Sequence, residues 1–89
     1  MDDQTDSLLE FPCEFPIKAL GRAAPHLDAR VTQIVRRHAP DLSEGAVSVR
    51  ESREGRFLSV TVTVQPASRA QLDAIYRDLN ADEQILMTL

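Results

Sequence analysis

The chain has 89 residues, of which 43% are apolar and 27% are charged, and its formal net charge is −4. A chain of this length makes one domain, and this composition is typical of globular proteins rather than of disordered or collagen-like chains. No apolar run approaches the about 18 residues that span a membrane, and the acidic start is unlike a signal peptide. We therefore expect one cytoplasmic domain with no membrane partner.

Cysteine and histidine are too few to suggest a metal centre. The chain has one cysteine, Cys13, and its two histidines, His26 and His38, are far apart in sequence. This set excludes an internal disulfide and offers no spaced group of metal ligands. Cys13 could be drawn with either histidine as a thiol and base, but no signature marks an orienting residue, and free cysteines are commonly buried. We expect a non-enzymatic protein without metal or cofactor, in which Cys13 is buried or half-buried.

Negative charge is concentrated at the start of the chain. The first ten residues hold four acids and no base, namely Asp2, Asp3, Asp6 and Glu10. Residues 11–89 are therefore formally neutral, and we interpret residues 1–7 as a disordered acidic tail. A neutral body argues against nonspecific binding to nucleic acid, which requires concentrated Lys and Arg.

The first half of the chain predicts a strand and a helix. Three of the four residues of Leu8–Phe11 are large and apolar, and the segment is expected to be ordered and to pack on the core. From Phe15 to Leu20 apolar residues alternate, which predicts a strand that Gly21 ends. A helix is expected from near Pro25 to near Ala39, and one apolar stripe at helical spacing predicts its buried side: Leu27, Val31, Ile34 and Val35.

The second half predicts a hairpin, a helix and a last strand. Val47–Arg50 and residues 57–65 alternate apolar and polar positions on either side of Glu54-Gly55, which predicts two strands joined by a reversal. The run from Ser68 to Gln71 fits a capping box at the start of a helix, whose apolar residues are Leu72, Ile75, Tyr76 and Leu79. Asn80-Ala81-Asp82 closes this helix, and residues 84–89 predict a short final strand with Ile85, Met87 and Leu89 on one face.

This order of elements defines the expected fold class. A strand, a helix, two strands, a helix and a strand make an α+β protein, a two-layer ferredoxin-like β-α-β-β-α-β sandwich. We expect an antiparallel sheet in the order 4-1-3-2 with both helices on one face, formed by residues 8–89 as a single domain.

Several segments resemble one known family. The run Leu8–Gly21, read LLEFPCEFPIKALG, resembles the opening signature of the YbeD-like family of small, uncharacterised bacterial proteins. Residues 37–40 (RHAP), 55–64 (GRFLSVTVTV) and 75–79 (IYRDL) resemble the family in order and spacing, so the resemblance covers Leu8 to Leu89. It implies a ferredoxin-like fold similar to the small-molecule-sensing ACT regulatory domains, a link to lipoate metabolism, and no catalytic residues.

Gly21 and Arg22 are the candidate ligand-binding residues. They begin the loop before the first predicted helix, where free amide groups attract anions, glycine permits close approach, and the guanidinium suits a carboxylate. The resemblance to ACT domains makes this loop a usual place for amino-acid ligands. With one glycine only, the alternative is a simple tight turn. We predict a small regulatory or ligand-sensing domain in which a small anionic ligand, such as an amino acid, contacts this pair. The alternative is a protein-interaction adaptor without a small ligand.

RNA recognition is a second, less favoured alternative for this order of elements. RNA-recognition modules place two or three aromatic residues on the middle strands to stack bases. Here the predicted open face offers only Phe57, and the chain has no Trp, so we expect no nucleic-acid partner. Interspersed acids also favour a solvated turn over an anion site at the three arginines near the reversal: Arg50, Arg53 and Arg56.

The last strand is a candidate interface because it lies at an edge of the predicted sheet. Ile85, Leu86 and Met87 are apolar on both parities, and no Lys or Pro blocks pairing with another chain. We predict a homodimer or a protein partner through this strand, with Leu86 pointing outward. The alternative is that Leu8–Phe11 folds back and covers the same edge.

Overall fold

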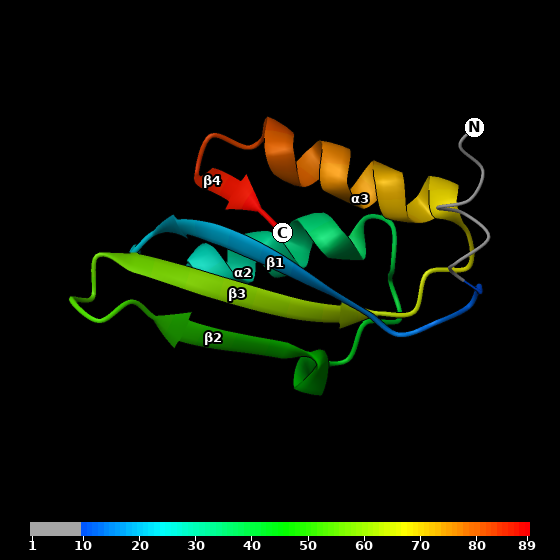
Figure 1. The fold of residues 1–89 in the computed structure, drawn as a ribbon, viewed down its shortest axis with the longest axis horizontal. Coiled ribbons are helices and arrows are strands. Elements are labelled where there is room, and N and C mark those ends of the chain that lie inside the picture. The colour runs from blue at the N-terminus through cyan, green and yellow to red at the C-terminus, as the bar shows by residue number, and fades with distance from the viewer. Residues whose placement is uncertain (1–9) are drawn as a thin grey trace.

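The computed structural model describes residues 10–89 as a four-stranded antiparallel sheet with two helices on one face (Figure 1). The predicted α+β sandwich is therefore confirmed. Residues 1–9 lie outside the described part, and with them the predictions for the tail 1–7 and for Leu8 and Leu9. The elements are β1 (Phe15–Arg22), α2 (Leu27–Arg36), the short 3₁₀ helix η1 (Glu44–Ala46), β2 (Val47–Glu51), β3 (Phe57–Val64), α3 (Arg69–Ala81) and β4 (Ile85–Thr88).

The strands lie in the order β2-β3-β1-β4, as the sequence predicts. β1 is central and pairs with β3 over its whole length, from Phe15 opposite Val64 to Arg22 opposite Phe57. On its other side β1 pairs with the shorter β4. β2 and β4 are thus the two edges of the sheet, and the two segments farthest apart in the described chain, β1 and β4, are neighbours.

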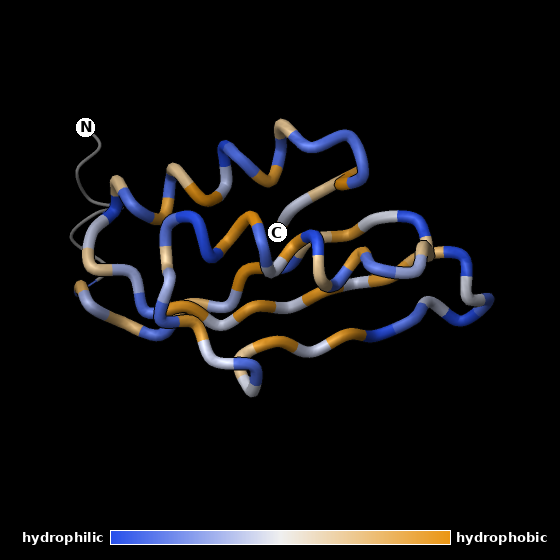
Figure 2. The backbone as a smooth tube through the Cα atoms, turned by 180° about the vertical axis from the view of Figure 1, so that it is seen from behind, coloured by the Kyte–Doolittle hydropathy of each residue, from blue (hydrophilic) through white to orange (hydrophobic). Residues whose placement is uncertain are grey.

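The core lies between the sheet and the helices. Alternate residues of β1 and β3 point to the helices, and the predicted stripe of α2 meets them; Figure 2 shows the apolar segments of strands and helices facing one another. Burying such side chains is worth about 1.5–3 kcal/mol each, which fixes the helices on this face. The core residues are Ile17, Ala19, Leu27, Val31, Ile34, Val35, Val60, Val62, Val64, Leu72, Ile75, Leu79 and Ile85.

The helix α2 is shorter than the sequence predicts. It begins at Leu27, after His26 has turned the chain at a positive φ of 119°, and it ends at Arg36 rather than near Ala39. The Arg37 and His38 amides donate to the carbonyls of Ile34 and Val35, three residues back, so the last turn tightens before Pro40. These hydrogen bonds between residues three apart, in place of four apart, explain why α2 ends at Arg36.

The predicted capping box of α3 is present. Ser68 Oγ accepts a hydrogen bond from the Gln71 amide at 3.2 Å, and Gln71 Oε1 accepts one from the Ala67 amide at 2.6 Å. Gln71 Nε2 also donates to the His38 carbonyl at 2.7 Å. The cap therefore holds the start of α3 against the end of α2, a long-range contact that a local motif does not predict.

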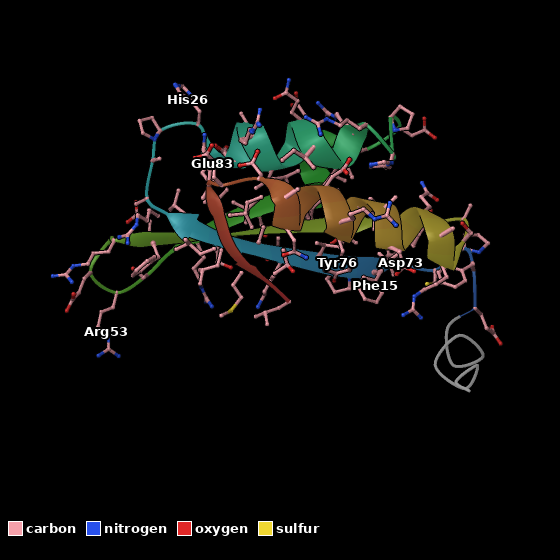
Figure 3. All side chains as sticks on the ribbon, turned by 90° about the horizontal axis from the view of Figure 1, so that it is seen from above. Phe15, His26, Arg53, Asp73, Tyr76 and Glu83 are labelled. Carbon is pink, nitrogen blue, oxygen red and sulfur yellow. The ribbon has the colours of Figure 1, made fainter. Side chains whose placement is uncertain are left out.

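The β2–β3 hairpin ends in a polar turn. Gly55 has a φ of 74°, which favours glycine, and the Phe57 amide donates to Ser52 Oγ at 3.1 Å. The turn is hydrophilic in Figure 2, and Arg53 projects away from it in Figure 3. Arg56 and Glu54 form an exposed ion pair of 3.5 Å. These contacts agree with the expected solvated turn.

In residues 10–89 no helix is long and apolar enough to cross a membrane.

Candidate functional site

Gly21 and Arg22 are the last two residues of β1, so the prediction that Gly21 ends the strand and opens a loop is wrong. Gly21 is packed on its core-facing side. A β-carbon there would lie 2.5 Å from the Gln84 carbonyl oxygen and 2.9 Å from Leu27 Cδ2. Neither distance leaves room for a side chain, and the same atoms fill the space that a ligand would need beside the α-carbon. The structure therefore gives this glycine a packing role, between β1, α2 and the segment that leads into β4.

Arg22 lies on the opposite side of the sheet. It is exposed, and its guanidinium carbon is 5.9 Å from the centroid of the Phe57 ring, its partner in register on β3. The next residue, Ala23, donates its amide to the Arg56 carbonyl at 2.8 Å. Gly21 faces the helices and Arg22 the open side of the sheet, so the structure does not bring the two together around one cavity. Contact of both with a small anion stays a prediction.

The edge strand β4 exposes large apolar side chains. Leu86 is 52% exposed and Met87 is 51% exposed, while Leu89, just beyond the strand, is 71% exposed. Ile85 is only 7% exposed and belongs to the core, so of the three predicted interface residues it offers no side chain to a partner. An interface here would use Leu86 and Met87 together with the outer backbone groups of the strand.

A β-bulge in β4 explains how two consecutive residues are both exposed. Met87 lies opposite Leu20 and Ile85 opposite Gly21, so Leu86 is an extra residue without a partner on β1. The sequence places Ile85, Met87 and Leu89 on one face by strict alternation. The structure corrects this prediction: Ile85 faces the core, while Met87 shares the open face with Leu20 because the bulge shifts the parity by one.

Two side chains of α3 hold β4 and the residue that follows it in place. Tyr76 Oη donates to the Leu89 carbonyl at 3.0 Å, and Thr88 Oγ1 donates to Asn80 Oδ1 at 3.1 Å. The Tyr76 ring also meets Phe15 edge-on, with centroids 6.4 Å apart, and the two lie together in Figure 3. Burial raises the pKa of the Tyr76 hydroxyl above its ordinary value.

Asp82 ties the turn before β4 to α2. Its Oδ2 accepts from Arg30 Nε at 2.7 Å and pairs with Arg30 Nη2 at 2.6 Å, while Oδ1 accepts from the Gln84 amide at 2.9 Å. Burial by itself would raise the pKa of this carboxyl. The hydrogen bonds from Gln84 and Arg30, with the charge of Arg30, outweigh burial and hold the pKa below its usual value.

A second polar cluster joins the two helices. His38 Nε2 lies 2.7 Å from Asp78 Oδ2, and Arg37 Nη1 lies 3.8 Å from the same oxygen. This contact with His38, helped by the charges of His38 and Arg37, lowers the pKa of the Asp78 carboxyl. The sequence gives His38 only a capping role at the end of its helix. Its contact across forty positions with α3 has no local signal.

The remaining candidate groups stay separate. Cys13 is a free, half-buried thiol, as expected. In residues 10–89 no three His, Cys, Asp or Glu side chains come together as a metal site. A shallow hollow of about 710 Å³ opens where the loop after α2 meets the start of β1 and the end of β3, lined by residues that include Glu14, Pro40 and Gln65. Neither Gly21 nor Arg22 lines it.

Comparisons with known proteins match nearly the whole chain. A family model described as "Protein of unknown function (DUF493)" matches residues 6–89. A UPF0250 protein of Chromobacterium violaceum is 46% identical over 89 residues, 100% of both chains, and one of Nitrosomonas europaea is 42% identical over 94% of this chain and 97% of its own. The solution structure of protein HP0495 from H. pylori has a TM-score of 0.69 at 11% identity, over 91% of this chain and 85% of its own, a likeness of fold alone.

Proposed function

We propose that this chain, which belongs to the DUF493 family of proteins of unknown function, acts by binding other proteins rather than by catalysis. The family includes the YbeD-like bacterial proteins, so the resemblance seen in the sequence is confirmed. The observation that carries the proposal is the edge of β4, where Leu86 and Met87 are both more than half exposed. The occupant that we assign to this edge is a second copy of the same chain.

The chemistry of β4 suits pairing with itself. In an antiparallel pair the backbone groups of alternate residues point away from the neighbouring strand, so β4 turns one set toward β1 and the other outward. None of the residues Ile85–Thr88 is charged or proline, and two copies related by a twofold axis would bring no like charges together. Leu86 of each copy would then lose water-exposed apolar surface.

The other edge of the sheet, β2, is less suited to pairing with another strand. β2 carries Arg50 and Glu51, whose charges oppose addition of another strand, and only Val49 among its large apolar residues is markedly exposed, at 46%. A contact through β2 would therefore bury charge, whereas a contact through β4 would not. This difference favours β4 as the joining edge and leaves the hairpin in solvent.

The surroundings of Gly21 and Arg22 support binding of a small anion less well than the edge of β4 supports binding of a protein. The Gln84 carbonyl and the Leu27 side chain occupy the space beside the Gly21 α-carbon, and Arg22 points to the other face. A protein partner needs no enclosed cavity, whereas small ligands are commonly held in one. The exposed edge thus supports the adaptor or regulatory role, through protein contacts, over the sensing of a small ligand.

The mass of the chain in solution tests the proposal. Light scattering at tens of micromolar should give twice the mass of one chain for the parent protein and the mass of one chain for Leu86→Lys, because lysine brings two charges together at the joining edge. Val49→Lys is the matched control, at a valine that is 46% exposed on the opposite edge against 52% for Leu86, and this variant should stay dimeric. A monomeric parent chain, or loss of the dimer in the control alone, would exclude the β4 pairing.

A further inference from the structure

The open face of the sheet carries positive charge although the chain as a whole is negative. Strand parity and register place Lys18 and Arg22 of β1 and Arg50 of β2 on the side away from the helices, which is the lower side of the sheet in Figure 3. No acid occupies the strand positions of this face in the described part of the chain. We call Lys18, Arg22 and Arg50 the cationic face.

The cations of this face are unpaired, unlike several others in the molecule. Within residues 10–89 no carboxylate forms an ion pair with a member of the cationic face, and Arg22 is held only over the Phe57 ring. Elsewhere guanidinium groups meet carboxylates of the same chain: Arg30 with Asp82, Arg37 with Asp78, Arg56 with Glu54, and Arg69 with Asp73. The cationic face thus offers charge that nothing in the described chain neutralises.

The geometry of the sheet sets the spacing of these charges. Leu20, Ser59 and Arg50 lie side by side across three strands. With strands about 4.8 Å apart and a rise of about 3.3 Å per residue, the α-carbons of Lys18 and Arg22 are each about 12 Å from that of Arg50 and about 13 Å from one another. This last distance is four residues of extended chain.

Apolar side chains adjoin the charges. Leu20 stands between Lys18 and Arg22 on β1, and Met87 lies beside Leu20 on β4, where it is 51% exposed. Hydroxyl groups of Ser59 and Thr61 fill the neighbouring positions on β3. The face therefore presents two cations with a leucine between them, next to an exposed methionine.

We propose that the cationic face binds an extended acidic segment of another protein, with carboxylates four residues apart and an apolar residue between them. Such a segment lying along β1 would set one carboxylate at Lys18 and the other at Arg22, with its middle side chain on Leu20 and Met87. Two cationic faces repel, so a second copy does not place its own cationic face here. A nucleic acid fits less well, because among residues 10–89 Phe57 is the only aromatic side chain at the strand positions of this face, and Arg22 already covers it.

This inference rests on the proposed protein-binding role but not on the β4 dimer. A chain that is monomeric by light scattering and still binds the probe described next would remove the dimer and keep the cationic face. A dimeric chain that fails to bind the probe would keep the dimer and remove the binding role of the cationic face. The two proposals therefore fail in different experiments.

The probe is a fluorescein-labelled nine-residue peptide, Ser-Val-Glu-Ser-Leu-Ser-Glu-Val-Ser, with its two Glu residues four positions apart. Its matched control has Lys in place of both Glu residues, and a third peptide has its two Glu residues two positions apart. Fluorescence anisotropy should show binding of the first peptide that weakens as salt is raised, weaker binding of the third, and none of the second. In NMR spectra of the protein labelled with nitrogen-15, the first peptide should shift the amide signals of Lys18, Ser59 and Arg50.

The variant Lys18→Gln/Arg22→Gln should weaken binding about two- to thirty-fold, since exposed ion pairs contribute about 0.2–1 kcal/mol each. Arg36→Gln/Arg77→Gln removes the same charge from the exposed sides of α2 and α3 and should leave the affinity unchanged. Equal binding by both double variants would overturn the proposal. So would shifts confined to the helices, failure of the parent chain to bind the acidic peptide, or tighter binding of a ten-nucleotide oligothymidine than of that peptide.

Discussion

Substitution of Gly21 by alanine tests the packing that joins β1, α2 and β4. The added methyl carbon would lie 2.5 Å from the Gln84 carbonyl oxygen, whereas ordinary contacts begin at 3.4 Å, so this backbone must move by about 0.9 Å. Leu27 Cδ2, at 2.9 Å, blocks movement of the methyl group toward α2. Because Gln84 directly precedes β4, the shift must disturb the pairing of β4 with β1.

The expected cost follows from two opposing effects. Added volume in a packed core costs about 1–3 kcal/mol, and the lower backbone freedom of alanine in the unfolded chain returns up to about 1 kcal/mol. We expect the free energy of unfolding to fall by about 1–2 kcal/mol, which lowers Tm by roughly 5–15 °C in a domain of this size. Urea unfolding at 25 °C measures the first quantity, and a thermal scan the second.

Gly45→Ala is the control for this substitution. Gly45 lies in η1, and apart from its chain neighbours no heavy atom of the described residues lies within 4 Å of the added carbon. The free energy of unfolding of this variant should therefore stay within about 0.5 kcal/mol of the parent. Amide exchange at Ile85 and Met87 should become faster in Gly21→Ala and remain unchanged in Gly45→Ala. Equal urea midpoints for Gly21→Ala and the parent would refute the packing argument.

Three further predictions concern contacts that hold the helices and β4. The chain has one tyrosine, so absorbance at 295 nm follows Tyr76 alone, and its titration midpoint should lie above about 10 in the folded chain and near 10 in urea; equal midpoints would contradict its burial. Ser68→Ala should cost about 1 kcal/mol in urea unfolding through loss of the α3 cap, whereas Ser43→Ala, at a cap without a side-chain hydrogen bond, should cost little. The pKa of the Asp82 carboxyl is lowered in the folded chain, so its carboxylate contributes stability above about pH 4 that is lost as the pH falls through the folded pKa. Asp82→Asn should therefore lose less stability than the parent between about pH 5 and 2. Parallel curves of unfolding free energy against pH for the two proteins would disprove this.

Local patterns predict the elements well where one physical cause dominates. β3 alternates without interruption, so its parity, and with it the inner face of the sheet, follows from the sequence. The cap at Ser68 is a short-range motif and appears as expected. The order of the strands then follows from covering one face with two helices.

Other features depend on contacts between distant segments and could not be predicted in this way. The bulge at Leu86 arises where the backbone before β4 meets Gly21, so alternation within β4 alone assigns Met87 to the wrong face. The contact of His38 with Asp78 depends on how α2 and α3 cross. The cationic face appears only once registers place Lys18 near Arg50, since Arg50 reads in the sequence as part of a solvated turn.

The central position of β1 bears on the order in which the molecule folds. The β2–β3 hairpin joins neighbouring segments and can close early, within microseconds, whereas pairing of β1 with β4 must close a loop that contains nearly the whole described chain. A contact of that kind forms late, so β4 should be largely unstructured in the transition state for folding. Substitutions in β4 should then accelerate unfolding and leave the refolding rate nearly unchanged, whereas those in the hairpin should slow refolding.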